Sequence, residues 1–87
     1  MKFKIKKLNN TCGACPSQWD MELTNGKIIY IRYRWGYFRA EISEHATDDV
    51  MDAVGGKCIF EKDIGGSLDG VMDADQMLDL LKDIVEW

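Results

Sequence analysis

Residue types that commonly carry catalysis or cross-linking are scarce in this sequence. It holds one histidine (His45), one proline (Pro16) and three cysteines. It has no run of about 18 apolar residues, so it predicts no transmembrane helix. The basic residues at its start are not followed by an apolar segment and a cleavage site, so no signal peptide is predicted. We therefore expect a cytoplasmic protein.

Recognised enzyme motifs are also absent from the sequence. There is no P-loop, no GxSxG and no HExxH. Cys58 and His45 are the residue types of a nucleophilic pair. A chain of 87 residues with a single histidine leaves little room for a substrate cleft around such a pair. The sequence predicts a protein that is not an enzyme.

The composition favours one globular domain over residues 1–87. The chain is 46% hydrophobic and includes three residues each of Trp, Tyr and Phe, which is typical of a folded domain. The net charge of −4 is unevenly distributed. Residues 1–43 carry eight Lys and Arg against three Asp and Glu, whereas residues 44–87 carry three against twelve. This segregation indicates a charged interaction surface.

The first half of the chain alternates apolar and polar residues with the period of a β-strand. The alternating runs cover residues 2–8, 17–24, 27–34 and 37–43. Asn25-Gly26 separates the second run from the third, and this pair favours a tight hairpin because both residue types tolerate positive φ. We expect a meander of four antiparallel strands, with the CxxC in the loop after the first.

The second half changes to a helical period. Thr47 is a suitable cap for a short helix over residues 48–54, and two glycines end it. Residues 57–61 predict a short strand, and a last helix begins at Asp73 or Asp75. The apolar stripe of that helix consists of Met77, Leu81, Ile84 and Val85. The sequence thus predicts an α+β fold, with helices packed on one face of an antiparallel sheet.

Cys12 and Cys15 form a CxxC, a spacing that serves a disulfide, a redox pair or a zinc knuckle. Reducing conditions in the cytoplasm and the odd number of cysteines disfavour a disulfide. A thioredoxin-like redox pair needs its CxxC to open a helix. Alternating residues and a hairpin follow here instead, so a thiol oxidoreductase is a less favoured alternative.

A structural zinc site needs four ligands, and the rest of the sequence supplies two. Cys58 and His45 complete a Cys3His set with Cys12 and Cys15. We therefore predict a structural Zn²⁺ that staples the loop after the first strand. Asp20 or Glu44 is an alternative to His45 as the fourth ligand.

Basic and aromatic residues alternate over residues 30–39, YIRYRWGYFR. On a strand, Tyr30, Arg32 and Arg34 share one face, and single-strand nucleic-acid binders use such faces. The overall acidity, with an isoelectric point of about 4.8, argues against strong phosphate binding. A nucleic-acid-binding module is therefore the second functional hypothesis.

Acidic residues recur in the second half, most regularly at every fourth position of the last predicted helix. Such a surface suits a strongly basic protein partner, for instance a channel that normally holds nucleic acid. The residues that we predict to contact this partner are Asp48, Asp49, Asp52, Asp75, Asp79, Asp83 and Glu86. A membrane partner is not expected, and a direct nucleic-acid partner is not favoured.

Two segments carry a resemblance: CPSQW at residues 15–19 and YIRYRWGYF at residues 30–38. With them the chain resembles small phage- or prophage-encoded proteins that carry a PSQW segment followed by a YxRYRWG strand. It also resembles a zinc-containing phage anti-CRISPR of the class that inhibits type II RNA-guided nucleases. This resemblance implies a non-enzymatic, monomeric inhibitor in the host bacterial cytoplasm. The inhibitor would bind the effector nuclease and block its binding or cleavage of DNA.

Overall fold

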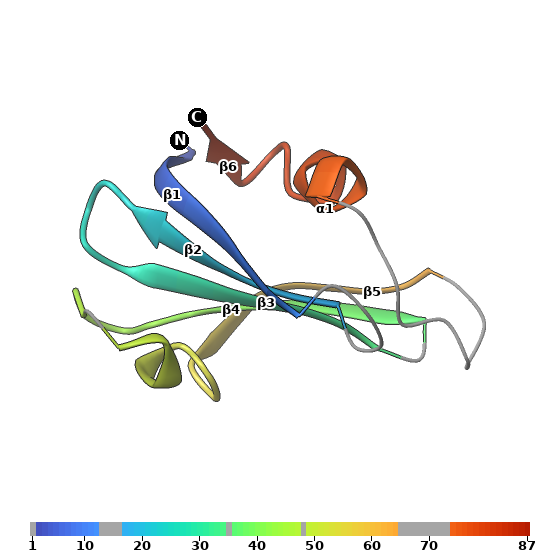
Figure 1. Ribbon diagram of the computed structural model, residues 1–87, viewed down its shortest axis with the longest axis horizontal. Coiled ribbons are helices and arrows are strands. Elements are labelled where there is room, and N and C mark those ends of the chain that lie inside the picture. The colour runs from blue at the N-terminus through green and yellow to red at the C-terminus, as the bar shows by residue number, and fades with distance from the viewer. Residues whose placement is uncertain (1, 13–16, 35, 48, 65–73) are drawn as a thin grey trace.

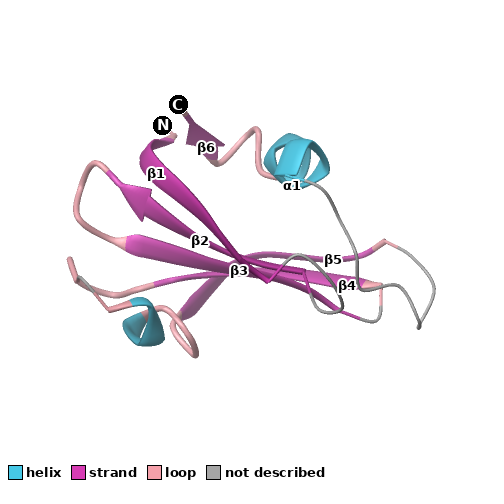
Figure 2. Cartoon of the chain, in the orientation of Figure 1, coloured by secondary structure: helices cyan, strands magenta, loops and turns pink. Residues whose placement is uncertain are grey.

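The computed structural model describes residues 2–12, 17–34, 36–47, 49–64 and 74–87. Within these residues the chain forms one curled sheet of six strands, accompanied by a single turn of 3₁₀ helix and one short α-helix (Figures 1 and 2). In chain order the elements are β1 (Phe3–Cys12), β2 (Ser17–Leu23), β3 (Ile28–Arg34), β4 (Tyr37–Ile42), η1 (Val50–Asp52), β5 (Lys57–Asp63), α1 (Ala74–Leu80) and β6 (Val85–Glu86).

The strand order in the sheet is β5-β4-β3-β2-β1-β6. The first five strands pair antiparallel, as the predicted meander requires, and β6 lies parallel to β1. The sheet therefore has six strands, whereas the sequence predicted about four. The α+β description holds only roughly, because the described part of the chain is mostly sheet.

The hairpin between β2 and β3 is confirmed, although its loop is one residue longer than a two-residue turn. Leu23 N–H donates to the Lys27 carbonyl at 3.0 Å, and Gly26 N–H donates to the Leu23 carbonyl at 3.0 Å. Gly26 has φ of 87°. This is the pattern of a turn followed by a left-handed residue, which suits glycine because it lacks Cβ.

Alternation along the strands separates a buried inner face from a polar outer face. The inner face carries Trp19 and Met21 on β2, Ile29 and Ile31 on β3, and Phe38 and Ala40 on β4, all of them buried as their period-2 pattern predicts. Met77 on α1 and Leu81 just after it are fully buried against this cluster. The inner face is therefore the side that α1 covers.

Both predicted helices are shorter in the structure than in the sequence prediction. The segment 48–54 forms only the turn η1, and the last helix ends at Leu80. Val85 then pairs with Phe3 in β1, and Phe3 N–H donates to the Ile84 carbonyl at 2.8 Å. Pairing with the free edge of β1 satisfies backbone groups that a longer helix would satisfy internally, so the chain leaves the helix early.

The first strand is longer than expected, because β1 continues to Cys12. The CxxC therefore starts within a strand rather than in the loop after it, which corrects the prediction. The described helices include none that is long and apolar enough to cross a membrane.

The outer face is covered at one end by the segment that contains η1. Ile28 and Ala53 are buried outside the main core, and η1 contacts β3. Glu41 on the outer face accepts a hydrogen bond from Gly55 N–H at 3.1 Å, and Thr47 N–H donates to the Gly26 carbonyl at 2.9 Å. The other end of the outer face, beyond Glu41, carries the residues described next.

Candidate functional site

All three arginines of the sequence lie at one end of the outer face of the sheet. Arg32 and Arg34 are on β3, where the buried residues Ile31 and Tyr33 fix the alternation that turns them outward. Arg39 is on β4. The antiparallel register pairs Arg32 with Arg39 and Arg34 with Tyr37, so the four side chains form a two-by-two block. We call this set, Arg32, Arg34, Tyr37 and Arg39, the arginine block.

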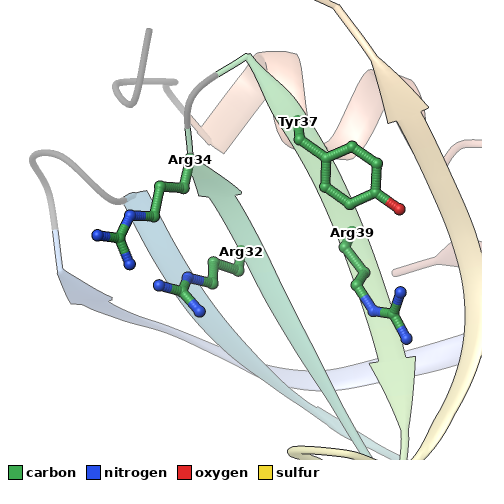
Figure 3. A pocket seen from close by; sticks show the side chains of 4 residues that line it. All are labelled: Arg32, Arg34, Tyr37 and Arg39. Carbon is green, nitrogen blue, oxygen red and sulfur yellow. The ribbon is translucent and has the colours of Figure 1, made fainter. Parts of the chain in front are cut away.

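The arginine block lines an open cavity of about 530 Å³. Figure 3 shows that Arg32 and Arg34 extend from β3 toward β2, whereas Arg39 and the hydroxyl of Tyr37 extend toward β5. The guanidinium groups therefore stand on two sides of the hollow. A cavity of this size falls in the range that holds small ligands or the ends of larger ones.

Carboxylates from β4 and β5 hold Arg39 in place. Its Nε lies 3.4 Å from Glu41 Oε1, and its Nη1 lies 3.3 Å from Glu61 Oε2. The Tyr37 hydroxyl donates to the same Glu61 oxygen. Through Glu61, the tyrosine ring and the Arg39 guanidinium are fixed relative to each other, so this side of the cavity is formed in advance.

The electrostatics of this network follow from its hydrogen bonds. Donation to the Glu61 carboxylate raises the pKa of Tyr37, because the carboxylate stabilises the protonated phenol. The same bond is the main reason why the pKa of Glu61 is lowered. The pKa of Arg39 is raised as well, and the first cause is a hydrogen bond between its guanidinium and the Tyr37 side chain. At neutral pH the network therefore consists of a neutral tyrosine, an ionised carboxylate and a charged arginine.

Arg32 breaks two ordinary rules of sheet structure. It lies directly opposite Arg39, and like charges opposite each other in adjacent strands are destabilising. Its Nε is buried and has no hydrogen-bond partner among the described residues. Local conflicts of this kind concentrate at functional sites, because a residue chosen only for stability would avoid them.

Acidic residues border the arginine block. The row of the outer face next to Arg32 and Arg39 contains Asp20 and Glu41, with Tyr30 between them. Burial is the main cause that raises the pKa of Tyr30, and Glu41 adds to it. Positive charge is therefore confined to one small area, which fits a compact anionic group better than an extended polyanion.

Of the predicted zinc ligands, the structure describes the side chains of His45 and Cys58. His45 is exposed and lines a separate cavity of about 310 Å³. The Cys58 thiol donates to Glu61 Oε2 at 3.7 Å and to the Phe60 carbonyl at 3.6 Å. Of the alternative ligands, Glu44 lines the same cavity as His45.

Two of the predicted zinc ligands come from different parts of the sheet. Cys12 ends β1 and Cys58 lies on β5, with three strands between them in the strand order. Cys15 lies outside the described residues. No group of three or more His, Cys, Asp or Glu side chains in the described ranges is arranged to hold a metal. The Cys3His site stays a prediction that zinc quantification on the purified protein would test.

The predicted partner-binding acidic residues fall into two separate groups. Asp49 and Asp52 are exposed at η1, whereas Asp75, Asp79 and Asp83 are exposed on and after α1. Glu86 is exposed on β6, and Asp48 lies outside the described residues. In Figure 1, η1 and α1 lie on opposite sides of the sheet. Among the described residues, these acidic side chains therefore belong to elements on two sides of the sheet.

Sequence reasoning found half of the arginine block and missed the other half. It placed Tyr30, Arg32 and Arg34 on one face but did not join Arg39 to them. The sequence did contain a signal for Arg39. Apolar and polar residues alternate in both β3 and β4, and only two residues separate the two strands. A link that short sets the register that pairs Arg34 with Tyr37. The contribution of Glu61 had no local signal.

Comparison with known proteins gave no match for this chain among protein-family models, curated proteins or solved structures.

Proposed function

We propose that this chain is a binding protein that recognises a compact anionic group, a phosphate or a carboxylate, at the arginine block. The observation that supports this function is that every arginine of the sequence lines one open cavity. The eight lysines lie elsewhere. Arginine differs from lysine in presenting a planar fork that binds a phosphate or carboxylate through two parallel hydrogen bonds.

The arrangement of the block also supports this function. Among the described residues the buried Nε of Arg32 has no hydrogen-bond partner, which is a cost that the fold carries at this site. An anion in the cavity would also offset the two positive charges that Arg32 and Arg34 extend from β3 in the same direction. Because Glu61 already fixes Arg39 and Tyr37, binding needs little further ordering of these side chains.

The test is an NMR titration of the ¹⁵N-labelled protein with inorganic pyrophosphate and, separately, with citrate. We expect saturable shifts of the arginine Nε–Hε signals with at least one of the two anions. Arg32→Gln should abolish saturation. Lys82→Gln, which removes one positive charge at an exposed site after α1, should leave binding unchanged. If neither anion gives saturable shifts, or if both variants behave alike, the proposal is wrong.

Inhibition of a type II CRISPR effector nuclease by a zinc-stapled protein stays a prediction from sequence. The exposed acidic residues of η1 and α1 are available for such a partner. A cleavage assay of the purified nuclease with increasing amounts of this chain tests it directly. Inhibition that Arg32→Gln leaves intact and that charge-neutral variants of α1 remove would separate this hypothesis from anion binding at the arginine block.

A further inference from the structure

We infer that the anion recognised at the arginine block belongs to a short segment of single-stranded nucleic acid, with phosphates on the arginines and a base on the ring of Tyr37. This inference rests on the proposed anion-binding function. From sequence, nucleic-acid binding by the Tyr-Arg strand ranked below a protein partner, because the overall acidity argued against strong phosphate binding. The structure places all three arginines at one cavity. The net charge of −4 for the whole chain therefore does not describe this part of the surface.

The arginine block combines the two groups that bind single strands. Arginine forks bind phosphate oxygens, and an aromatic face stacks a base whatever its sequence. The ring of Tyr37 lines the cavity and is held by the bond from its hydroxyl to Glu61. A ligand that carried only an anionic group would leave this ring unused, whereas a nucleotide uses both the ring and the arginines.

The spacing of Arg32 and Arg34 fits a phosphate chain. The two residues are two positions apart on β3, so their Cα atoms are about 6.7 Å apart, and both side chains extend in the same direction (Figure 3). They therefore present two guanidinium groups in a row beside an open surface. A base pair cannot stack on the Tyr37 ring without unpairing, so the site favours a single strand over a duplex.

The surroundings of the block limit how much strand it can hold. Glu41 borders it on the side of η1, and Glu61 and Asp63 border it on β5. A backbone that continued over these carboxylates would be repelled. The block therefore holds about two phosphates, which makes the expected salt dependence shallow.

An acidic protein segment is the competing ligand for the same charges. It would supply carboxylates but no base, and it would meet a chain that is itself negative overall. The two ligands differ in what the ring of Tyr37 contributes, and this difference can be measured.

The experiment is fluorescence anisotropy with a labelled single-stranded hexamer of thymidylate and the full-length chain. We expect one-to-one binding with a slope of log affinity against log salt of about −1.4, which corresponds to two phosphates. A twelve-nucleotide strand should bind only about twofold more tightly, because it offers more positions but not more contacts. A duplex that contains the hexamer should bind more weakly than the single strand.

Two variants separate the ring of Tyr37 from its hydroxyl. Tyr37→Leu should weaken binding of the hexamer by about 5- to 150-fold, the usual contribution of one stacked base. It should weaken pyrophosphate binding much less than hexamer binding, because pyrophosphate has no base to stack on the ring. Tyr37→Phe keeps the ring and should recover most of the hexamer affinity that Tyr37→Leu loses. Circular dichroism of each variant shows whether it is folded. The salt slope and the dependence on strand length are measured on the unmodified chain, so these two tests do not depend on the folding of a variant.

The outcomes distinguish this inference from the function on which it rests. If pyrophosphate binds and the hexamer does not, nucleic-acid recognition is wrong while anion binding stands. The same conclusion follows if Tyr37→Leu binds the hexamer as tightly as the unmodified chain, or if the duplex binds equally well. If neither the hexamer nor the two small anions bind, both proposals fail.

Discussion

Replacing Arg32 should make the protein more stable and remove its anion binding. Arg32→Thr takes away a buried Nε that has no partner among the described residues, and it removes the like charge opposite Arg39. Threonine suits a strand, and the position lies in the middle of β3. If Arg32 serves binding, its replacement should remove anion binding and raise the free energy of unfolding.

The magnitude follows from the opposing contributions. Leaving a buried donor unsatisfied costs roughly 1–3 kcal/mol, and a like-charge pair across two strands adds up to about 1 kcal/mol. Against this gain, the half-buried arginine stem contributes packing worth roughly 0.8 kcal/mol for each buried methylene. We expect Arg32→Thr to raise the free energy of unfolding by about 1 kcal/mol, which is a rise in Tm of roughly 4–8 °C for a domain of this size.

The assay combines urea denaturation, followed by circular dichroism, with the pyrophosphate titration. Arg32→Lys is the matched control, because it keeps the charge but loses the planar fork, and it should bind pyrophosphate more weakly without the full gain in stability. If Arg32→Thr lowers the free energy of unfolding by 1 kcal/mol or more, Arg32 has a structural role and the reasoning from local conflict is refuted. Retained pyrophosphate binding in Arg32→Thr would refute it equally.

Three further predictions concern the core, a close approach and the hydrogen-bond network. Phe38→Ala should cost roughly 3–5 kcal/mol of unfolding free energy in urea denaturation, because the ring is fully buried; a cost below 1 kcal/mol would contradict the described core. Gly56→Ala should destabilise more than Gly55→Ala, since an added Cβ at residue 56 meets a β4 carbonyl oxygen at 2.3 Å, whereas residue 55 has open space and only its φ of 80° opposes alanine. Equal costs would contradict this placement. Glu61→Gln should lower the pKa of Tyr37 toward 10. An NMR titration against pH measures this change, with the other two tyrosines as internal controls. Because the folded-state pKa of Tyr37 is raised, the stability from its hydrogen bond is present below pH 10 and is lost as the pH rises through the folded-state value, and the variant should lack this alkaline loss.

The strands and the core follow from local sequence pattern. Apolar residues at alternate positions can be buried together only on one face of a strand, so the inner positions of β2, β3 and β4 were predicted correctly, Trp19 and Phe38 among them. The hairpin at Gly26 was predictable because a residue without Cβ reaches positive φ at little cost. Each of these features depends on residues that are close in the chain.

The ends of the fold depend on distant residues, and there the local pattern misled. The apolar stripe after Asp75 has a helical period, yet Val85 leaves the helix and pairs with Phe3 at the opposite end of the chain. The unpaired edge of β1 offers backbone hydrogen bonds that no local pattern records. The length of the last helix was therefore decided by tertiary structure.

The arginine block shows the same division between sequence and structure. The sequence by itself determined that Arg32 and Arg34 face outward, because Ile31 and Tyr33 between and beside them are apolar and face the core. Only the tertiary structure decided that Arg39 lies opposite Arg32 and that Glu61, from a strand more than twenty residues away, holds Arg39 and Tyr37. The physical reason is that strand register and cross-strand contacts are set by pairing between segments, whereas the direction of a side chain is set by the strand that carries it.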